Sequence, residues 1–403
     1  MFKNNNNMVG LDIGTSSIKV LVVSRQSEGS ELEVLSQVTA PSSGVRKGVV
    51  VKPLQVAEEI RLAIEEAEVS AGQKINSVYS SINGSHLTAV FSKGVIAVSR
   101  ADREISQEDI DRAIQNAQTI SLPANKEIID VFPKEFIIDG EGGIKEPLGM
   151  KGTRLETEAL LLYAFSPYLQ NLTKAILSAG FQIADIKACP VAAAEAVLTP
   201  QQKELGVALV DIGADTTGLA VFEEENLIHT AIFPIGGNHI TNDIAIGLRC
   251  DINLAEKIKK EFGACLLKKD KKEKYKRDKI KVTDSLSFSR KMLVGIIEAR
   301  VSEIFEQINK ELKKISRQKL LPAGIVLVGG SAKLPRIVDL AKRELKLPCR
   351  IGKPKGFIGL EEDPSLAVVC GLVLSGIDSE KGSGVFGEGF IHKLKNFFRI
   401  FVP

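Results

Sequence analysis

The strongest constraint on the fold is a strand–turn–strand pattern that the chain contains twice. Residues 8–23, MVGLDIGTSSIKVLVV, combine an apolar run, a Gly-Thr-Ser-Ser turn and a second run rich in Val, Ile and Leu. Residues 205–222, LGVALVDIGADTTGLAVF, repeat this order, and the two Asp-Ile-Gly sequences lie 199 positions apart. Repetition at half the chain length predicts two related α/β domains that face each other.

Helical patterns lie between the predicted strands, so the sequence indicates a mixed α/β protein. In residues 53–72, PLQVAEEIRLAIEEAEVSAG, apolar residues recur at intervals of three and four, and the pattern ends at Gly72. A chain of 403 residues is too long for one compact core, which favours two domains or a bilobal fold.

Composition excludes several classes of protein. No window is apolar enough for a transmembrane helix, and the N-terminus has no signal-peptide core, so we expect the bulk of the protein in the cytosol. The five cysteines are too far apart for a zinc site or a disulfide framework. Net charge is +3, but nine basic and three acidic residues fall in 268–281. The rest of the chain carries a small net negative charge, which argues against a protein that binds nucleic acid generally. The basic run is interpreted as a solvated loop or as a docking surface for an acidic segment or anionic lipid.

The repeated turn has the chemistry of a phosphate site. Gly14 and Gly213 allow the backbone to approach a ligand closely, and successive N–H groups in such a turn form an anion-binding nest. The carboxylates at the strand ends, Asp12 and Asp211, cannot hold phosphate directly but can hold Mg²⁺, usually through water. Two such turns, one per domain, predict a nucleotide whose phosphates are held from both sides.

Other nucleotide-binding folds fit the sequence less well. The chain contains no G-x-x-x-x-G-K-[ST] sequence, which excludes a Walker P-loop. The glycine turn leads into a predicted strand rather than a helix, which argues against a Rossmann site.

These motifs resemble those of the actin, heat-shock-chaperone and sugar-kinase superfamily, whose members bind ATP between two duplicated lobes. GLDIGTSSIKV resembles the first phosphate motif, with Asp12, Gly14, Thr15, Ser16 and Lys19, and VDIGADTTG resembles the second, with Asp211, Gly213, Thr216 and Thr217. GIVLVGGSAKLPRI resembles the adenosine motif, with Gly329, Gly330, Ser331, Lys333 and Leu334. PIGGNHIT and AEKIKKEFG resemble two further nucleotide contacts, with Gly236, Gly237 and Asn238 near the phosphates and Glu256 and Lys259 near ribose and adenine.

A closer resemblance, over nearly the whole chain, is to FtsA, the actin-like family of bacterial cell division. GVRKGVVVKP (44–53), SSINGSHL (80–87), FPKEFIIDGEGGIKEPLGMKGTRLE (132–156) and the C-terminal stretch carry it. The resemblance implies an actin-like bilobal fold with an inserted subdomain, 1C. The expected division is subdomain 1A at 1–84 and 161–198, an SHS2-like 1C at 85–160, 2A at 199–244 and 316–374, 2B at 245–315, a flexible linker at 375–389 and an amphipathic helix at 390–403.

The same resemblance implies partners and a location. FtsA proteins polymerise on the cytoplasmic face of the cell membrane at the division septum, and they tether the tubulin-like protein FtsZ there. They bind the FtsZ C-terminal peptide in subdomain 2B, where Arg300 matches a basic family position. Subdomain 1C is expected to contact later division proteins.

Two departures from the superfamily pattern argue against rapid ATP hydrolysis. Asp215 stands where relatives often have a glycine that offers its backbone to the γ-phosphate, and a carboxylate there repels phosphate unless it points away or helps hold Mg²⁺. Cys189 stands where the chaperones carry a glutamate near the attacking water, and a thiol is a poor base at neutral pH. We therefore expect ATP binding with at most weak ATPase activity, and we assign no catalytic residue.

The last residues of the chain, GFIHKLKNFFRIFVP, form the pattern of a membrane-surface helix. On a helical wheel, seven apolar residues gather on one side: Phe390, Ile391, Leu394, Phe397, Phe398, Phe401 and Val402. Lys395 and Arg399 lie opposite, and Lys393 flanks the apolar side. Such a helix is suited to lying in the interface of an anionic membrane. The preceding Gly- and Ser-rich stretch has the composition of a flexible tether rather than of a packed connection.

Two alternatives share the same superfamily. A sugar or polyol kinase needs an aspartate base beside a polar pocket, for which no matching segment is found. A pilus-assembly actin homologue of the PilM type shares the fold but is not expected to carry the C-terminal helix.

Overall fold

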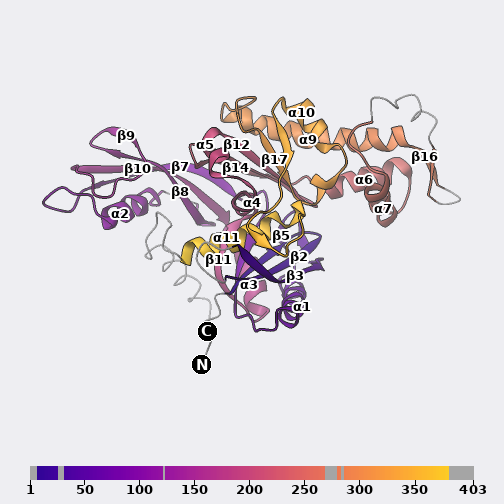
Figure 1. The fold of residues 1–403 in the computed structure, drawn as a ribbon, viewed down its shortest axis with the longest axis horizontal. Helices are drawn as coiled ribbons and strands as arrows, with labels where there is room; N and C mark the ends of the chain where they lie inside the picture. The colour runs from indigo at the N-terminus through magenta and orange to yellow at the C-terminus, as the bar shows by residue number, and fades with distance from the viewer. Residues whose placement is uncertain (1–6, 26–30, 121–122, 268–278, 283–285, 381–403) are drawn as a thin grey trace.

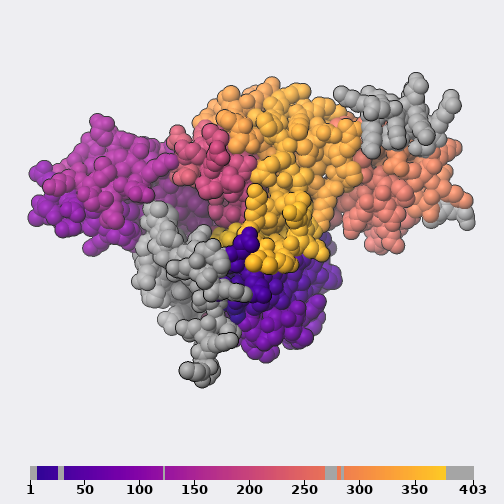
Figure 2. Space-filling view, viewed as in Figure 1, coloured from indigo at the N-terminus to yellow at the C-terminus, as the bar shows by residue number. Residues whose placement is uncertain are grey.

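The computed structural model describes residues 7–25, 31–120, 123–267, 279–282 and 286–380 (Figure 1). Two lobes are each built around a sheet that contains one copy of the repeated strand pair, and a third sheet belongs to an insert in the first lobe. The predicted bilobal α/β fold with an inserted subdomain is confirmed. Figure 2 shows the insert and the region around α6 and α7 projecting from opposite sides of the molecule.

Lobe 1, as we call the first, has a six-stranded sheet in the order β11-β6-β1-β2-β3-β19. Its strands are β1 (Asn7–Ile13), β2 (Ser17–Ser24), β3 (Leu32–Pro41), β6 (Ser77–Ile82), β11 (Gln182–Ala188) and β19 (Phe357–Ile358), with α1 (Pro53–Ala71) and α3 (Ser166–Ser178) packed against it. The predicted end of the first helix is confirmed, because Gly72 follows α1 in the left-handed conformation with φ 67°. A short hairpin, β4 (Val45–Arg46) and β5 (Val49–Val50), precedes α1.

Lobe 2 has a five-stranded sheet in the order β14-β13-β12-β17-β18. Its strands are β12 (Val207–Ile212), β13 (Thr217–Glu223), β14 (Asn226–Phe233), β17 (Ile325–Val328) and β18 (Cys349–Ile351). Its helices are α6 (Gly237–Leu248), α7 (Ile252–Phe262), α9 (Arg290–Lys314) and α10 (Ile337–Leu345), with a 3₁₀ turn at Gly330–Lys333 and a small hairpin of β15 (Lys279–Lys281) and β16 (Ser287–Ser289). β12 and β13 pair antiparallel as β1 and β2 do, so the duplication seen in the sequence is a duplication of structure.

The insert has its own sheet and its own core. β7 (Thr88–Ala97), β8 (Lys126–Ile138), β9 (Glu141–Ile144) and β10 (Arg154–Phe165) form the sheet, and α2 (Gln107–Ala117) covers one face. Ser106 and Asp109 form a capping box at the start of this helix. The insert also contacts lobe 2, where Lys145 Nζ donates a hydrogen bond of 3.0 Å to the carbonyl of Glu224.

The C-terminal part of the chain returns to lobe 1, which corrects the expected division. We expected 316–374 to lie in subdomain 2A, but β19 pairs with β3 of lobe 1. A 3₁₀ turn at Pro364–Leu366 then leads into α11 (Ala367–Glu380). This helix packs on β1 and on α4 (Cys189–Val197). The apolar composition of α11 does not say which lobe it covers. The expected linker from 375 also begins late, because the helix continues to Glu380.

Some predictions concern segments outside the described residues. These are the amphipathic helix at 390–403, the linker beyond 380 and positions 268–278 of the basic run. Among the helices that the structure describes, none combines the length and apolar character that crossing a membrane requires.

The contact between α11 and α4 predicts a large stability effect at one glycine. A Cβ atom at Gly371 would lie 1.6 Å from the carbonyl oxygen of Ala192, so Gly371→Ala must force the two helices apart. We expect a loss of about 3 kcal/mol in the free energy of unfolding, measured by urea titration. The matched control is Gly295→Ala, exposed in α9 with no neighbour within 4 Å, which should stabilise by about 0.5 kcal/mol. Equal effects at both sites would contradict this packing.

Candidate functional site

The two Asp-Ile-Gly turns fold in the same way at corresponding ends of the two sheets. In lobe 1 the amide of Gly14 donates to the carbonyl of Ser17 at 3.0 Å, and in lobe 2 the amide of Gly213 donates to the carbonyl of Thr216 at 2.9 Å. We call these turns phosphate turn 1 (residues 14–16) and phosphate turn 2 (residues 213–216). Each turn directly follows a buried strand, as the sequence predicts. The second-to-last residue of that strand is an aspartate, Asp12 in β1 and Asp211 in β12.

Asp12 is buried beside a cation and a hydroxyl. Lys19 Nζ donates to Asp12 Oδ2 at 3.0 Å, and Ser81 Oγ donates to Asp12 Oδ1 at the same distance. Ser81 also accepts from the amide of Ile13, so it joins β6 to the end of β1. Ser81 was not among the predicted site residues, although it lies in the SSINGSHL segment that carries the family resemblance.

Asp211 lies close enough to this group for the charges of the two lobes to interact. Burial, and then the charge of Asp12, raise the pKa of Asp211 to about 6, while Lys19 opposes the shift. Burial likewise raises the pKa of the Cys189 thiol well above its usual range, helped by both carboxylates. The structure therefore brings Asp12, Asp211 and Lys19 together, as predicted. Lys19 thus pairs directly with Asp12 and acts on Asp211 through its charge.

Glycines and amides from three elements surround phosphate turn 2. The amides of Gly237 and Asn238, at the start of α6, donate to the carbonyls of Gly213 at 2.9 Å and Ala214 at 2.7 Å. Ser331 Oγ, from the predicted adenosine motif, also donates to the Gly213 carbonyl. Gly329 has φ 88° and lies so close to Asp211 that a Cβ atom there would be 2.4 Å from Oδ1. The second phosphate motif, the α6 start and the adenosine motif thus form one site.

The predicted ribose and adenine contacts also lie at this site. Lys259 Nζ, on α7, donates to the carbonyl of Gly237 at 3.1 Å and to Thr241 Oγ1 at 2.8 Å, and it forms an ion pair with Glu256 at 2.6 Å. Burial lowers the pKa of Lys259. These contacts fix α7 against the start of α6, so both residues have a structural role as well as a predicted binding role.

Other predicted site residues have contacts of different kinds. Lys333 forms an ion pair with Asp363, and Leu334 is buried in the lobe 2 core. Thr217 Oγ1 donates to the buried carbonyl of Ile235, which is a structural bond. A Cβ atom at Gly330 would meet nothing within 4 Å, so this position faces open space.

Arg300 does not present a free cation in the structure. Its guanidinium makes two hydrogen bonds to Asp243 on α6, from Nε at 2.6 Å and from Nη2 at 3.0 Å, and a third bond goes to Glu303. Contact with an acidic peptide would have to share or break this pairing, so the role of Arg300 stays a prediction.

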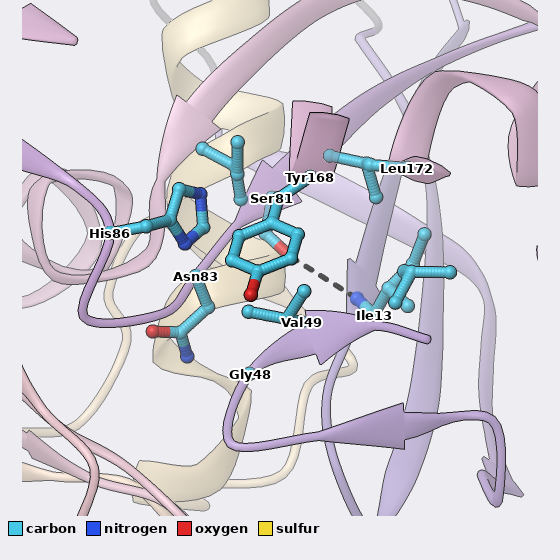
Figure 3. Close-up of a pocket in the computed structure, with 10 residues that line it drawn as sticks. Ile13, Gly48, Val49, Ser81, Asn83, His86, Tyr168 and Leu172 are labelled. Carbon is cyan, nitrogen blue, oxygen red and sulfur yellow. Dashed lines mark hydrogen bonds between the residues drawn. The ribbon is translucent and has the colours of Figure 1, made fainter. Parts of the chain in front are cut away.

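A small cavity lies beside Ile13, the last residue of β1 (Figure 3). It is lined by residues of β1, the β4–β5 hairpin, β6 and α3, among them Ile13, Val49, Ser81 and Leu172. The ring of His86 packs edge-on against Tyr168 with 5.0 Å between ring centres, and both its nitrogens are buried without a hydrogen-bond partner. Burial lowers the pKa of His86 to about 4. The imidazole is therefore neutral near pH 7.

Comparison with protein families gives two matches along the chain. The family model described as "Cell division protein FtsA" matches residues 208–371, and the model "SHS2 domain inserted in FTSA" matches residues 84–163. The second match covers β7 to β10, the insert of lobe 1.

Curated relatives extend this similarity over most of the chain. "Cell division protein FtsA" of Pseudomonas aeruginosa is 37% identical over 93% of this chain and 90% of its own length. The protein of the same name from Bacillus subtilis is 37% identical over 92% of this chain and 83% of its own length.

Solved structures with the same fold are more distant in sequence. The PilM–PilN type IV pilus biogenesis complex contains a chain with TM-score 0.67 and 18% identity, covering 92% of this chain and 98% of that one. MreB5 of Spiroplasma citri bound to ADP has TM-score 0.57 and 14% identity, covering 94% and 99%. At these identities the likeness is one of fold alone.

His86 predicts a pH dependence of stability. Its pKa is about 4 in the folded protein and 6.5 in an unfolded chain, so the folded state binds this proton less readily. The stability that the neutral His86 ring contributes to the folded state is fully present above pH 6.5, and it is lost as the pH falls from 6.5 toward 4. For a partly enclosed ring we expect a loss on the order of 1 kcal/mol by pH 5.

The measurement is urea unfolding of the wild type and of His86→Phe at pH 7 and pH 5. The phenylalanine variant keeps a ring against Tyr168 but cannot titrate, so its stability should fall less between the two pH values. Identical pH dependence in both proteins would show that His86 makes no such contribution.

Proposed function

The chain belongs to the FtsA family of cell division proteins, and on this premise we propose that it binds MgATP between its lobes, polymerises on the cytoplasmic membrane at the septum and tethers FtsZ there. The observation that carries the nucleotide part is the convergence of two like turns, Asp12 and Asp211, and the α6 start on one glycine-rich site. The fold neighbour MreB5, solved with ADP, supports the same assignment.

The described residues fit an Mg²⁺ nucleotide. Asp12 and Asp211 would hold the ion through bound water, and the ion would neutralise phosphate charge. The amides of the two phosphate turns other than those of Gly14 and Gly213, which donate within the turns, would bind phosphate oxygens together with Lys19. Gly330, where a Cβ atom would meet nothing within 4 Å, would lie beside the nucleoside, and Gly329 allows this segment to approach Asp211 closely.

The site is poorly equipped to activate an attacking water. Cys189, at the place of the chaperone glutamate, is 3% exposed, and its raised pKa keeps it a neutral thiol. Both oxygens of Asp215 accept hydrogen bonds from protein groups, Lys47 N and Asn238 Nδ2. ATP in this proposal acts mainly as a structural ligand, with at most slow hydrolysis.

Membrane attachment is proposed from the sequence of 390–403. Burying seven apolar side chains would give on the order of 10 kcal/mol, at about 1.5 kcal/mol each. Ordering a dozen residues costs about 1 kcal/mol or more apiece, partly offset by helix hydrogen bonds. A single helix would therefore bind weakly. Many copies in one polymer would bind strongly through effective concentration.

Two further partners belong to this proposal. Subdomain 2B, which holds α7, α9 and Arg300, would bind the FtsZ C-terminal peptide. The insert would contact later division proteins, since it projects from the side of the molecule opposite α7 (Figure 2).

Replacing Asp211 tests the nucleotide site. Asp211→Asn keeps the shape of the side chain but removes the charge, so the gain in ATP affinity that Mg²⁺ provides should fall at least tenfold. Titration of a fluorescent ATP analogue with Mg²⁺ and with EDTA measures this gain. Asp339→Asn, exposed on α10, is the matched control and should leave it unchanged. An Mg²⁺ effect of wild-type size in Asp211→Asn would contradict the assignment.

Replacing Phe397 tests the membrane helix. Phe397→Asp puts a charge on the apolar side and should release the protein from anionic liposomes in a pelleting assay, while ATP binding is retained. Asn396→Asp adds the same charge one residue away on the polar side and should pellet far better. The anchor assignment is wrong if both variants pellet like the wild type.

A further inference from the structure

The turn of the β4–β5 hairpin reaches both phosphate turns. Lys47 and Gly48 form this turn with φ values of 49° and 77°, as in the tight two-residue turns of hairpins. The amide of Lys47 donates to Asp215 Oδ2, in phosphate turn 2, at 3.1 Å. The next amide, that of Gly48, donates to Thr15 Oγ1, in phosphate turn 1, at 3.2 Å. Adjacent amides of one turn thus join the two lobes.

Both carboxylate oxygens of Asp215 accept a hydrogen bond. Its other oxygen, Oδ1, accepts a hydrogen bond of 2.8 Å from Asn238 Nδ2 at the start of α6. The aspartate is therefore held on one side by its own lobe and contacts lobe 1 on the other. Hydrogen bonds to an ionised acceptor are among the stronger ones in proteins.

A second bond crosses between the lobes beside the first. Asn83 Nδ2, in the loop after β6, donates to Thr216 Oγ1 at 3.2 Å. The loop and the hairpin pack as one unit, because a Cβ atom at Gly48 would lie only 3.0 Å from the amide nitrogen of Gly84. Gly48, Val49 and Asn83 lie together on one side of the cavity in Figure 3.

The base of the hairpin is fixed to lobe 1. Val45 and Val50 are 3% and 4% exposed, and Asn171 Nδ2 on α3 donates to the carbonyl of Val50 at 3.0 Å. The tip of the hairpin cannot follow lobe 2 independently of its own lobe. Separation of the lobes at this point must break the bonds to Asp215 and Thr216.

We propose that Asp215 is a positioning residue that latches phosphate turn 2 to the β4–β5 hairpin and so controls nucleotide release through lobe opening rather than through phosphate contact. This inference rests on the proposed nucleotide binding. Because the latch holds the lobes and touches no phosphate, it slows the release of ATP and ADP by the same factor. The latch also gives a role to the carboxylate of Asp215, which stands where proteins of the superfamily often have a glycine.

The first test needs no nucleotide. Amide hydrogen exchange at residue resolution is measured on the full-length wild type, on Asp215→Ala and on the surface control Asp339→Ala. In Asp215→Ala the Lys47 amide should exchange at least tenfold faster, while the Gly48 amide, held by Thr15 within lobe 1, keeps its protection. Unchanged exchange at Lys47, or an equal loss at both amides, overturns the latch.

The second test measures release. Fluorescent ATP and ADP analogues are chased with excess unlabelled nucleotide in the presence of Mg²⁺. Asp215→Ala should speed the release of both by about tenfold, and Asn83→Ala, which removes the neighbouring bond, should speed both to a lesser extent. An effect on ATP alone would assign Asp215 to the γ-phosphate or its metal ion and overturn the proposal, as would unchanged release.

The two tests separate this inference from the proposed function. A wild type that binds neither nucleotide would refute nucleotide binding, and the exchange rate of the Lys47 amide would still decide whether the latch exists.

Discussion

The structure depends on two carboxylates, the buried Asp12 of lobe 1 and the half-buried Asp211 of lobe 2, that share one electrostatic environment. Asp12 is stabilised by Lys19 and Ser81, whereas Asp211 has its pKa raised by burial and by the charge of Asp12. Like charges in a protein interior are unfavourable unless a cation or a donor lies between them. Asp12 and Asp211 can therefore lie near each other only when cations or hydrogen-bond donors, such as Lys19 and Ser81, offset their negative charges.

The immediate surroundings are accordingly backbone and small residues. Gly329 approaches Asp211 too closely for any side chain, and the amides of Gly237 and Asn238 are directed at the carbonyls of phosphate turn 2. Around this shell the two lobes are connected by different means. α4 packs on α11 in lobe 1 and on β12 and β13 in lobe 2, and the hairpin tip at Lys47 contacts Asp215 of phosphate turn 2.

Local patterns in the sequence predicted the local parts of this arrangement. The duplicated strand pairs, the end of α1 at Gly72 and the convergence of Asp12, Asp211 and Lys19 follow from short motifs whose chemistry is self-contained. Contacts between distant segments could not be read in this way. The partner of Asp215 is a backbone amide 168 positions away, which carries no side-chain signal, and Arg300 finds Asp243 across 57 positions. The assignment of α11 to lobe 2 was wrong for the same reason, since an apolar helix does not specify which sheet it covers.

The packing of α11 also fixes where the end of the chain is attached. This helix contacts β1, β2, β6 and α4, so everything that follows Glu380 starts from lobe 1. A pull on the C-terminal end would therefore load the sheet of lobe 1 directly, and it would reach lobe 2 only through the contacts between the lobes.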